Sequence, residues 1–191
     1  MQSSDNSSND SGSNLCGQCG LCCDGTLFVT MKPEKDDRID HLSLLAVETD
    51  ADGIRFYRQP CTAHAGHQCS VYHDRPQTCR GYQCKVLQDM QRGNLGQDVA
   101  VARVTEARRL AHKVSQDLAV WLDHPLPCAF DTLVSEFNRR WSAMDAIQRK
   151  VVNPVMLLEM GAVLVMLAKH FKGDNPQDLA ASPDLIQHSQ P

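Results

Sequence analysis

The chain has 191 residues, of which 42% are hydrophobic, and a formal net charge of −4. This length is enough for one domain, and the slightly acidic balance gives no global basic character that would attract nucleic acid or an anionic membrane, so we expect neither as a partner. The first 14 residues contain neither a basic nor an apolar stretch, which argues against a secretory signal and predicts a cytoplasmic protein.

Four regions are predicted in chain order. Residues 1–14 are mostly Ser, Asn, Asp and Gly with almost nothing apolar to bury, so we expect a disordered tail. Residues 15–95 hold eight of the nine cysteines and are expected to bind metal. Residues 96–172 have helical periodicity and are expected to pack within the same compact domain, before a flexible tail at 173–191.

Short elements are predicted in the cysteine-rich region. The segment TLFVTM at 26–31 is β-branched and aromatic, and GIRFYRQ at 53–59 alternates apolar and polar residues after the turn signal DADG. Both patterns are typical of strands. The segment KVLQDMQRG at 85–93 predicts a short helix that ends at Gly93.

Two amphipathic helices are predicted next. In the first, which begins near residue 98 and ends before Pro125, apolar residues recur at steps of three and four. They are Val101, Val104, Ala107, Ala111, Val114, Leu118 and Trp121. The second helix has Asp131 as its predicted N-cap, and one of its faces holds Leu133, Phe137, Trp141, Met144 and Ile147.

A third helix is predicted from Asn153, as N-cap, and Pro154 to a stop at Gly173. It is apolar nearly all round, but its 14-residue apolar run contains Glu159 and is too short to span a bilayer. We therefore expect a central helix buried by its neighbours, with core methionines Met156, Met160 and Met166. Short strands and loops packed on about three helices predict the α+β class, with a loop-rich part stapled by metal.

The first cysteine cluster, NLCGQCGLCCDG, has the spacing Cys16-x2-Cys19-x2-Cys22-Cys23. Two successive C-x2-C steps let three thiolates turn towards one centre, as in zinc knuckles and iron–sulfur loops. Adjacent side chains of an extended segment point to opposite sides. We therefore expect one of Cys22 and Cys23 to join Cys16 and Cys19, and the other to face a second centre or the interior.

The second cluster adds thiols at wider intervals: Cys61, Cys69, Cys79 and Cys84. Eight thiols are enough for two four-cysteine sites, or for one site with thiols in reserve. Three histidines among them, His64, His67 and His73, could replace a thiol, although each is more simply a solvated loop residue. Cys128 stands alone in the helical region and is expected to be a buried apolar residue.

Four thiolates suit zinc and iron–sulfur clusters equally well, so ligand type leaves the metal open. Arg75 and Arg80 lie within the second cluster and could bind a cofactor by offsetting the negative charge of metal-bound thiolates. The alternative is that they form salt bridges with acids such as Asp74. A thioredoxin-type dithiol is not indicated, because turn signals follow Cys16 where that motif requires a helix.

Two segments, CGQCGLCCDG and CSVYHDRPQTCRGYQC, together resemble the YkgJ-like cysteine-cluster proteins of bacteria, whose CxxCxxCC domain is described as zinc- or iron-chelating. The residues that match in order are Cys16, Cys19, Cys22, Cys23, Cys61, Cys69, Tyr72, Arg75, Pro76, Cys79, Arg80 and Tyr82. The resemblance covers about residues 15–90 and implies metal or iron–sulfur binding. A similar domain occurs in flagellin lysine N-methylases, but no nucleotide-binding motif accompanies it here, so that activity is not carried over.

Our first hypothesis is therefore a metal-binding protein that holds zinc or iron, the iron as an iron–sulfur cluster, through these eight thiolates. One alternative is a redox or protein-modifying enzyme that uses the cluster, although no catalytic residue is singled out by spacing. The other is a structural zinc module whose helical region contacts a protein partner.

Overall fold

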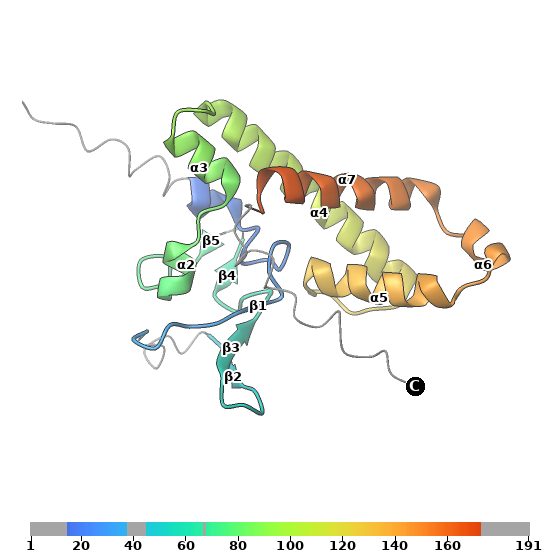
Figure 1. The fold of residues 1–191 in the computed structure, drawn as a ribbon, viewed down its shortest axis with the longest axis horizontal. Coiled ribbons are helices and arrows are strands. Elements are labelled where there is room, and N and C mark those ends of the chain that lie inside the picture. Colours follow the sequence, from blue (N-terminus) through green and yellow to red (C-terminus); the bar gives the residue numbers. More distant parts are fainter. Residues whose placement is uncertain (1–14, 38–44, 67, 173–191) are drawn as a thin grey trace, which may run out of the picture.

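The structure is a computed structural model that describes residues 15–37, 45–66 and 68–172. The tails predicted at 1–14 and 173–191 lie outside the described residues. A cysteine-rich part with short strands comes first along the chain, and a group of helices follows it and extends to one side (Figure 1).

The strands form two small antiparallel sheets. The first contains β1 (Thr30–Met31), β2 (Val47–Thr49) and β3 (Arg55–Arg58) in the order β1-β3-β2. The second is a hairpin of β4 (His64–Ala65) and β5 (Gln68–Cys69). The strand predicted at 53–59 is thus confirmed. Of the strand predicted at 26–31, only the last two residues are extended, as β1. The segment before them starts in a turn, because the Asp24 side chain accepts a hydrogen bond from the Thr26 N–H.

Two short helices complete the cysteine-rich part: α2 (Gln77–Gly81) and α3 (Lys85–Gln91). The predicted end of α3 is confirmed, because Gly93 adopts a φ of 75°, a conformation that glycine reaches without steric cost. Val86 and Leu87 are the buried residues of α3, and they join this helix to the core.

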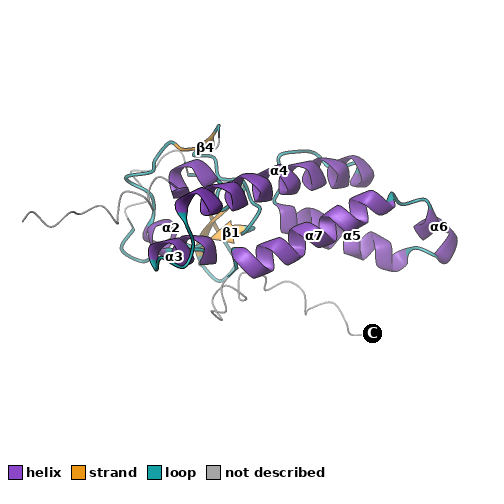
Figure 2. Cartoon of the chain, turned by 90° about the horizontal axis from the view of Figure 1, so that it is seen from above, coloured by secondary structure: helices purple, strands orange, loops and turns teal. Residues whose placement is uncertain are grey.

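The long helix α4 (Gln97–Leu122) connects the two parts. It packs against α3 near its start and against α5 and α7 further along (Figures 1 and 2). The predicted apolar face is correct in its middle, where Val104, Ala107, Ala111, Val114 and Leu118 are buried. It is wrong at the start, because Ala100 is buried and Val101 is 41% exposed.

The second predicted helix is two helices, α5 (Phe130–Ala143) and α6 (Ala146–Lys150). Asp145 starts α6 with a capping box. Its side chain accepts hydrogen bonds from the backbone N–H groups of Ile147 and Gln148, and the Gln148 side chain accepts one from the backbone N–H of Asp145. Met144 consequently ends α5, and Ile147 is 75% exposed. Asp131 is not the N-cap: Ala129 occupies that position.

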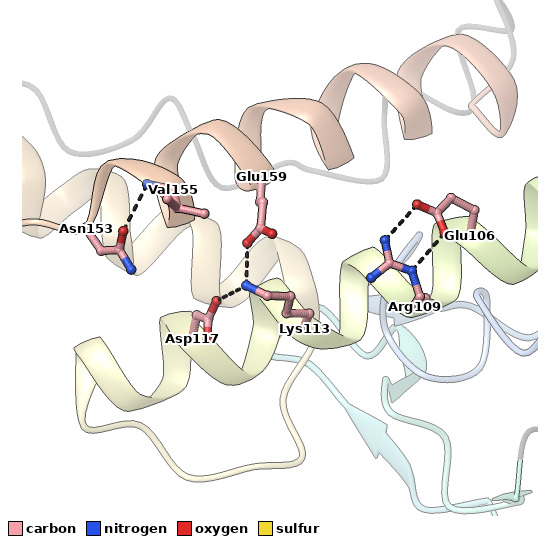
Figure 3. A network of polar contacts seen from close by, with 7 residues as sticks. All are labelled: Glu106, Arg109, Lys113, Asp117, Asn153, Val155 and Glu159. Carbon is pink, nitrogen blue, oxygen red and sulfur yellow. Dashed lines mark hydrogen bonds and ion pairs between the residues drawn. The ribbon is translucent and has the colours of Figure 1, made fainter.

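The third predicted helix is α7 (Pro154–His170), and the Asn153 side chain caps it by accepting a hydrogen bond from the Val155 N–H at 2.9 Å (Figure 3). Met156 and Met160 are buried as predicted, and Met166 packs at the edge of the core. The expectation of a central buried helix is wrong. Only one face of α7 packs on its neighbours, and Leu158 on another face is 75% exposed. Among the described residues, no helix is long and apolar enough to cross a membrane.

One polar contact explains the single acid within α7. Lys113 of α4 pairs with Asp117 one turn along its own helix and with Glu159 of α7 (Figure 3). The three side chains are partly exposed, so solvent screening keeps their contribution to the free energy of folding small. Their main effect is to fix how α7 lies along α4.

The two parts share one hydrophobic core. Its fully buried members include Leu21 and Tyr57 from the cysteine-rich part and Phe130 and Phe171 from the helical part. Polar contacts join the same parts, since the Tyr82 hydroxyl donates to the Phe171 carbonyl at 3.1 Å. A few short antiparallel strands packed with a helical region make an α+β fold, as the sequence predicts.

Candidate metal centre

The first cysteine cluster is held by a single turn of helix at 15–19 and the tight turn that follows it. Gly20 ends the helical turn with a φ of 73°, and its carbonyl accepts from the N–H groups of Cys23 and Asp24, each at 2.8 Å. The chain therefore reverses direction at Gly20. This reversal brings Cys22 back towards Cys16 and Cys19, the thiols of the helical turn.

Each thiol of the second cluster comes from a different element. Cys61 follows β3, and its N–H donates to the Cys23 carbonyl at 2.7 Å, which joins the two clusters directly. Cys69 ends β5, Cys79 lies in α2, and Cys84 is the residue that caps α3. The small sheets and short helices of this part thus serve to place four separate thiols.

All eight of these cysteines line one cavity of about 250 Å³. Cys128 does not line it: this thiol is partly buried at the edge of the core, where the sequence predicts full burial. All nine cysteines are free of disulfide bonds. Among the described residues, no Asp or Glu lines the cavity, so its potential metal ligands are predominantly soft sulfur donors.

The thiols can be grouped by which of their neighbours raise their pKa. Burial raises the pKa of Cys22 well above its ordinary value, and the neighbouring thiols Cys19, Cys23, Cys84 and Cys16 raise it further. Burial likewise raises the pKa of Cys19 to about 12, with added contributions from Cys84 and Cys16. We call the set of thiols Cys16, Cys19, Cys22 and Cys84 the first group.

Cys23 has different neighbours from Cys22. Burial raises its pKa, and the thiols that raise it further are Cys69, Cys61 and Cys79. Burial also raises the pKa of Cys79, on which Cys61 and Cys69 act in the same direction. We call the set Cys23, Cys61, Cys69 and Cys79 the second group. Cys23 also acts on Cys22, but the remaining thiol neighbours of these two adjacent residues differ.

The thiols surround the cavity and do not converge on one point. Within the described ranges, no three His, Cys, Asp or Glu side chains are close enough to make up a metal-binding group as they stand. Burial raises the pKa of seven of these thiols: Cys16, Cys19, Cys22, Cys23, Cys61, Cys79 and Cys84. Metal binding therefore requires that ligand thiols lose protons to the solvent.

The two predicted cofactor-binding arginines differ in their surroundings. Both line the cavity, but Arg75 is half-buried and Arg80 is exposed on the last turn of α2. The guanidinium carbon of Arg75 lies 3.8 Å from the centroid of the Tyr72 ring. Its positive charge lowers the pKa of Cys16 in the first group and of Cys79 in the second, against the larger effect of burial.

Two polar residues of the cavity wall were missed by sequence reasoning. The Tyr57 hydroxyl is hydrogen-bonded to Cys79 Sγ at 2.8 Å, and Gln59 is buried with its Oε1 lacking a hydrogen-bond partner. Both lie at alternate positions at the end of the segment predicted as a strand, so its period-two pattern could have placed them on the inner face. Of the histidines, His64 lines the cavity, His73 is exposed away from it, and His67 lies outside the described residues.

Comparison with known proteins concerns the same part of the chain. Residues 15–109 match the profile of the CxxCxxCC family, whose description is "Putative zinc- or iron-chelating domain". The matched segment contains both thiol groups and both arginines, and it ends within α4 before Cys128. No curated protein and no solved structure gives a significant match to the chain.

Proposed function

Because the chain belongs to the CxxCxxCC family of zinc- or iron-chelating domains, we propose that its eight cavity cysteines hold metal as two centres of four thiolates each. The observation that carries this proposal is that all eight thiols line one cavity, where a backbone hydrogen bond from Cys61 to Cys23 joins the two cysteine clusters. Four thiolates complete the coordination of a structural zinc ion and equally that of a [2Fe–2S] or [4Fe–4S] cluster.

We favour iron–sulfur clusters over zinc because of the volume of the cavity and the apolar residues that line it. Its volume of about 250 Å³ equals that of roughly eight water molecules, whereas a zinc ion bonded to four sulfurs at about 2.3 Å needs no cavity of its own. Leu21, Leu27 and Leu87 line the same space and would shield a cluster from water. Bound there, a cluster supplies one-electron redox chemistry, and a zinc ion supplies a cross-link between elements.

The proposed setting is the cytoplasm, where glutathione and thioredoxin keep thiols reduced. Free cysteines in a cavity suit that setting, because a metal centre needs every thiol as a thiolate and a disulfide would remove two of them.

Metal analysis of the purified full chain tests the proposal. The protein is expressed with added iron, purified without oxygen, and analysed for iron, acid-labile sulfide and zinc per chain, together with its visible spectrum. Iron and sulfide in equal amounts, with absorption near about 400 nm, support clusters. About two zinc ions per chain with no visible absorption support the zinc form. Less than one metal per chain under these conditions would contradict the proposal.

A second candidate function is binding of a protein partner through the helical part. The observation that favours it is the exposure of four apolar side chains: Ile147 of α6, Val151 directly after α6, and Leu158 and Val165 of α7. Replacing Leu158 and Val165 by Glu leaves the buried face of α7 intact. If the surface binds a partner, co-purification of that partner with wild-type protein is lost in this variant while metal content is unchanged.

A further inference from the structure

We propose that Arg75 is a positioning residue shared by both metal centres, whose guanidinium compensates the negative charge of the two thiolate groups together. This inference rests on the function proposed above and extends it. It also separates Arg75 from Arg80, a residue of the same charge on the same cavity wall.

The guanidinium of Arg75 is held in place, and no acid in residues 15–37, 45–66 and 68–172 forms an ion pair with it. It stacks 3.8 Å from the Tyr72 ring centroid, which fixes its plane. Its Nε is buried without a hydrogen-bond partner, and the salt bridge to Asp74 that the sequence left open is not formed. Because Arg75 is half-buried and its buried Nε has no hydrogen-bond partner, an anion is expected beside it.

The bound centres would provide that anion. A zinc ion or an oxidised iron–sulfur cluster with four thiolates carries a formal charge of about −2, so two centres place strong negative charge around one cavity. Arg75 lines this cavity together with the thiols of both groups. One guanidinium thus compensates two anionic centres.

Arg80 provides a matched control. It lies at the end of α2, five residues after Arg75, and is exposed to solvent. A solvated cation is screened, so it adds little to the binding of a nearby anion. Tyr57 provides a second comparison with Arg75, because its hydroxyl is hydrogen-bonded to a thiol of one group, Cys79 of the second group.

The test compares Arg75→Gln, Arg75→Lys and Arg80→Gln in the full chain, reduced and loaded with zinc alone. A chromogenic chelator competes for the metal, and the titration gives the number of ions held and the affinity of each. We expect Arg75→Gln to weaken both sites by about 10–100-fold, the usual effect of removing a group that supports metal ligands. Arg75→Lys keeps the charge and recovers part of the loss, and Arg80→Gln stays within about threefold of wild type.

Thermal unfolding of the metal-free proteins distinguishes this role from a merely structural one. Since Arg75 is an uncompensated cation without metal, metal-free Arg75→Gln is expected to unfold at a temperature no lower than wild type. The inference is overturned if Arg75→Gln holds both ions as tightly as Arg80→Gln, if it weakens one site alone, or if its metal-free form is clearly destabilised. If wild-type protein holds no metal, the proposed function itself is wrong and this inference fails with it.

Discussion

The hydroxyl oxygen of Tyr57 lies 2.8 Å from Sγ of Cys79, and both residues are held by regular elements: Tyr57 by β3 and Cys79 by α2. Tyr57 is 2% exposed, and burial together with the neighbouring Cys79 raises the pKa of its hydroxyl. The hydroxyl therefore keeps its proton and, when Cys79 is a thiolate, donates it in a hydrogen bond to sulfur. Hydrogen bonds to ligand sulfurs stabilise the thiolate and influence cluster reduction potentials.

The first prediction concerns this hydrogen bond. In Tyr57→Phe the ring still fills the core but Cys79 loses its donor, so metal in the second group should bind about tenfold more weakly while the first group is unchanged. Competition with a chelator, with two sites resolved, measures this. Tyr82→Phe is the matched control, because it also removes a tyrosine hydroxyl, one that donates to the Phe171 carbonyl. Equal weakening of both sites in Tyr57→Phe would rule out a local effect.

The second prediction concerns how stability depends on pH without metal. Burial raises the pKa of Cys84 to about 11 and of Cys19 to about 12, whereas a thiol in an unfolded chain titrates near about 8.5. The folded state therefore binds these protons more tightly than the unfolded state. The stability that they contribute is fully present below about pH 8.5, and it is lost as pH rises towards 11 and 12.

Metal reverses the sign of this dependence. In the metal-bound fold the ligand thiols carry no protons, whereas the unfolded chain binds protons at them below about pH 8.5. Stability should therefore rise with pH up to that point. Urea unfolding of chelator-treated and metal-loaded protein, between pH 6.5 and 10 with a phosphine reductant, measures both slopes. Slopes of the same sign in the two forms would contradict the account.

The third prediction concerns the two side-chain caps of the helical part. Asn153→Ala removes the cap of α7, which packs four buried residues on its neighbours, and should lower the free energy of unfolding by about 1 kcal/mol. Asp145→Ala removes the cap of α6, which has five residues and buries none of them, so its effect should be smaller. Chemical denaturation measures the two values, and metal content should be unchanged in both variants. A larger loss in Asp145→Ala would mean that α6 contributes more to the fold than its burial indicates.

The sequence predicts the parts of this fold that depend on local signals. The Asn153–Pro154 start of α7 and the Gly93 stop after α3 each follow from one residue and its neighbours, and both are confirmed. The division of α5 from α6 was missed because the apolar repeat continues to Ile147, whereas the Asp145 capping box interrupts the backbone there. The exposure of α7 could not be predicted from its composition, because burial depends on how many neighbours the tertiary fold supplies.

The same distinction holds for the candidate site. Spacing predicted that one of Cys22 and Cys23 joins Cys16 and Cys19 while the other faces a second centre or the interior, and the four cysteines of the second cluster were added by their number. Sequence reasoning did not assign Cys84 and the other three thiols of the second cluster to one centre or the other. These thiols come from separate elements, whose arrangement is set by long-range packing. Tyr57 and the difference between Arg75 and Arg80 were missed for the same reason, since contact with sulfur and depth in the cavity are properties of the folded chain.

The central claim is that two adjacent cysteines serve separate centres, and the variants Cys22→Ser and Cys23→Ser test it most directly. Each is purified without oxygen beside wild type and beside Cys128→Ser, which lies away from the cavity and should retain full metal content. The measurement is metal and sulfide per chain, with the visible spectrum. The account predicts that each variant keeps about half of the wild-type metal and that the two remaining spectra differ, because a different centre survives in each. Loss of all metal in both variants, or identical remaining spectra, would contradict it.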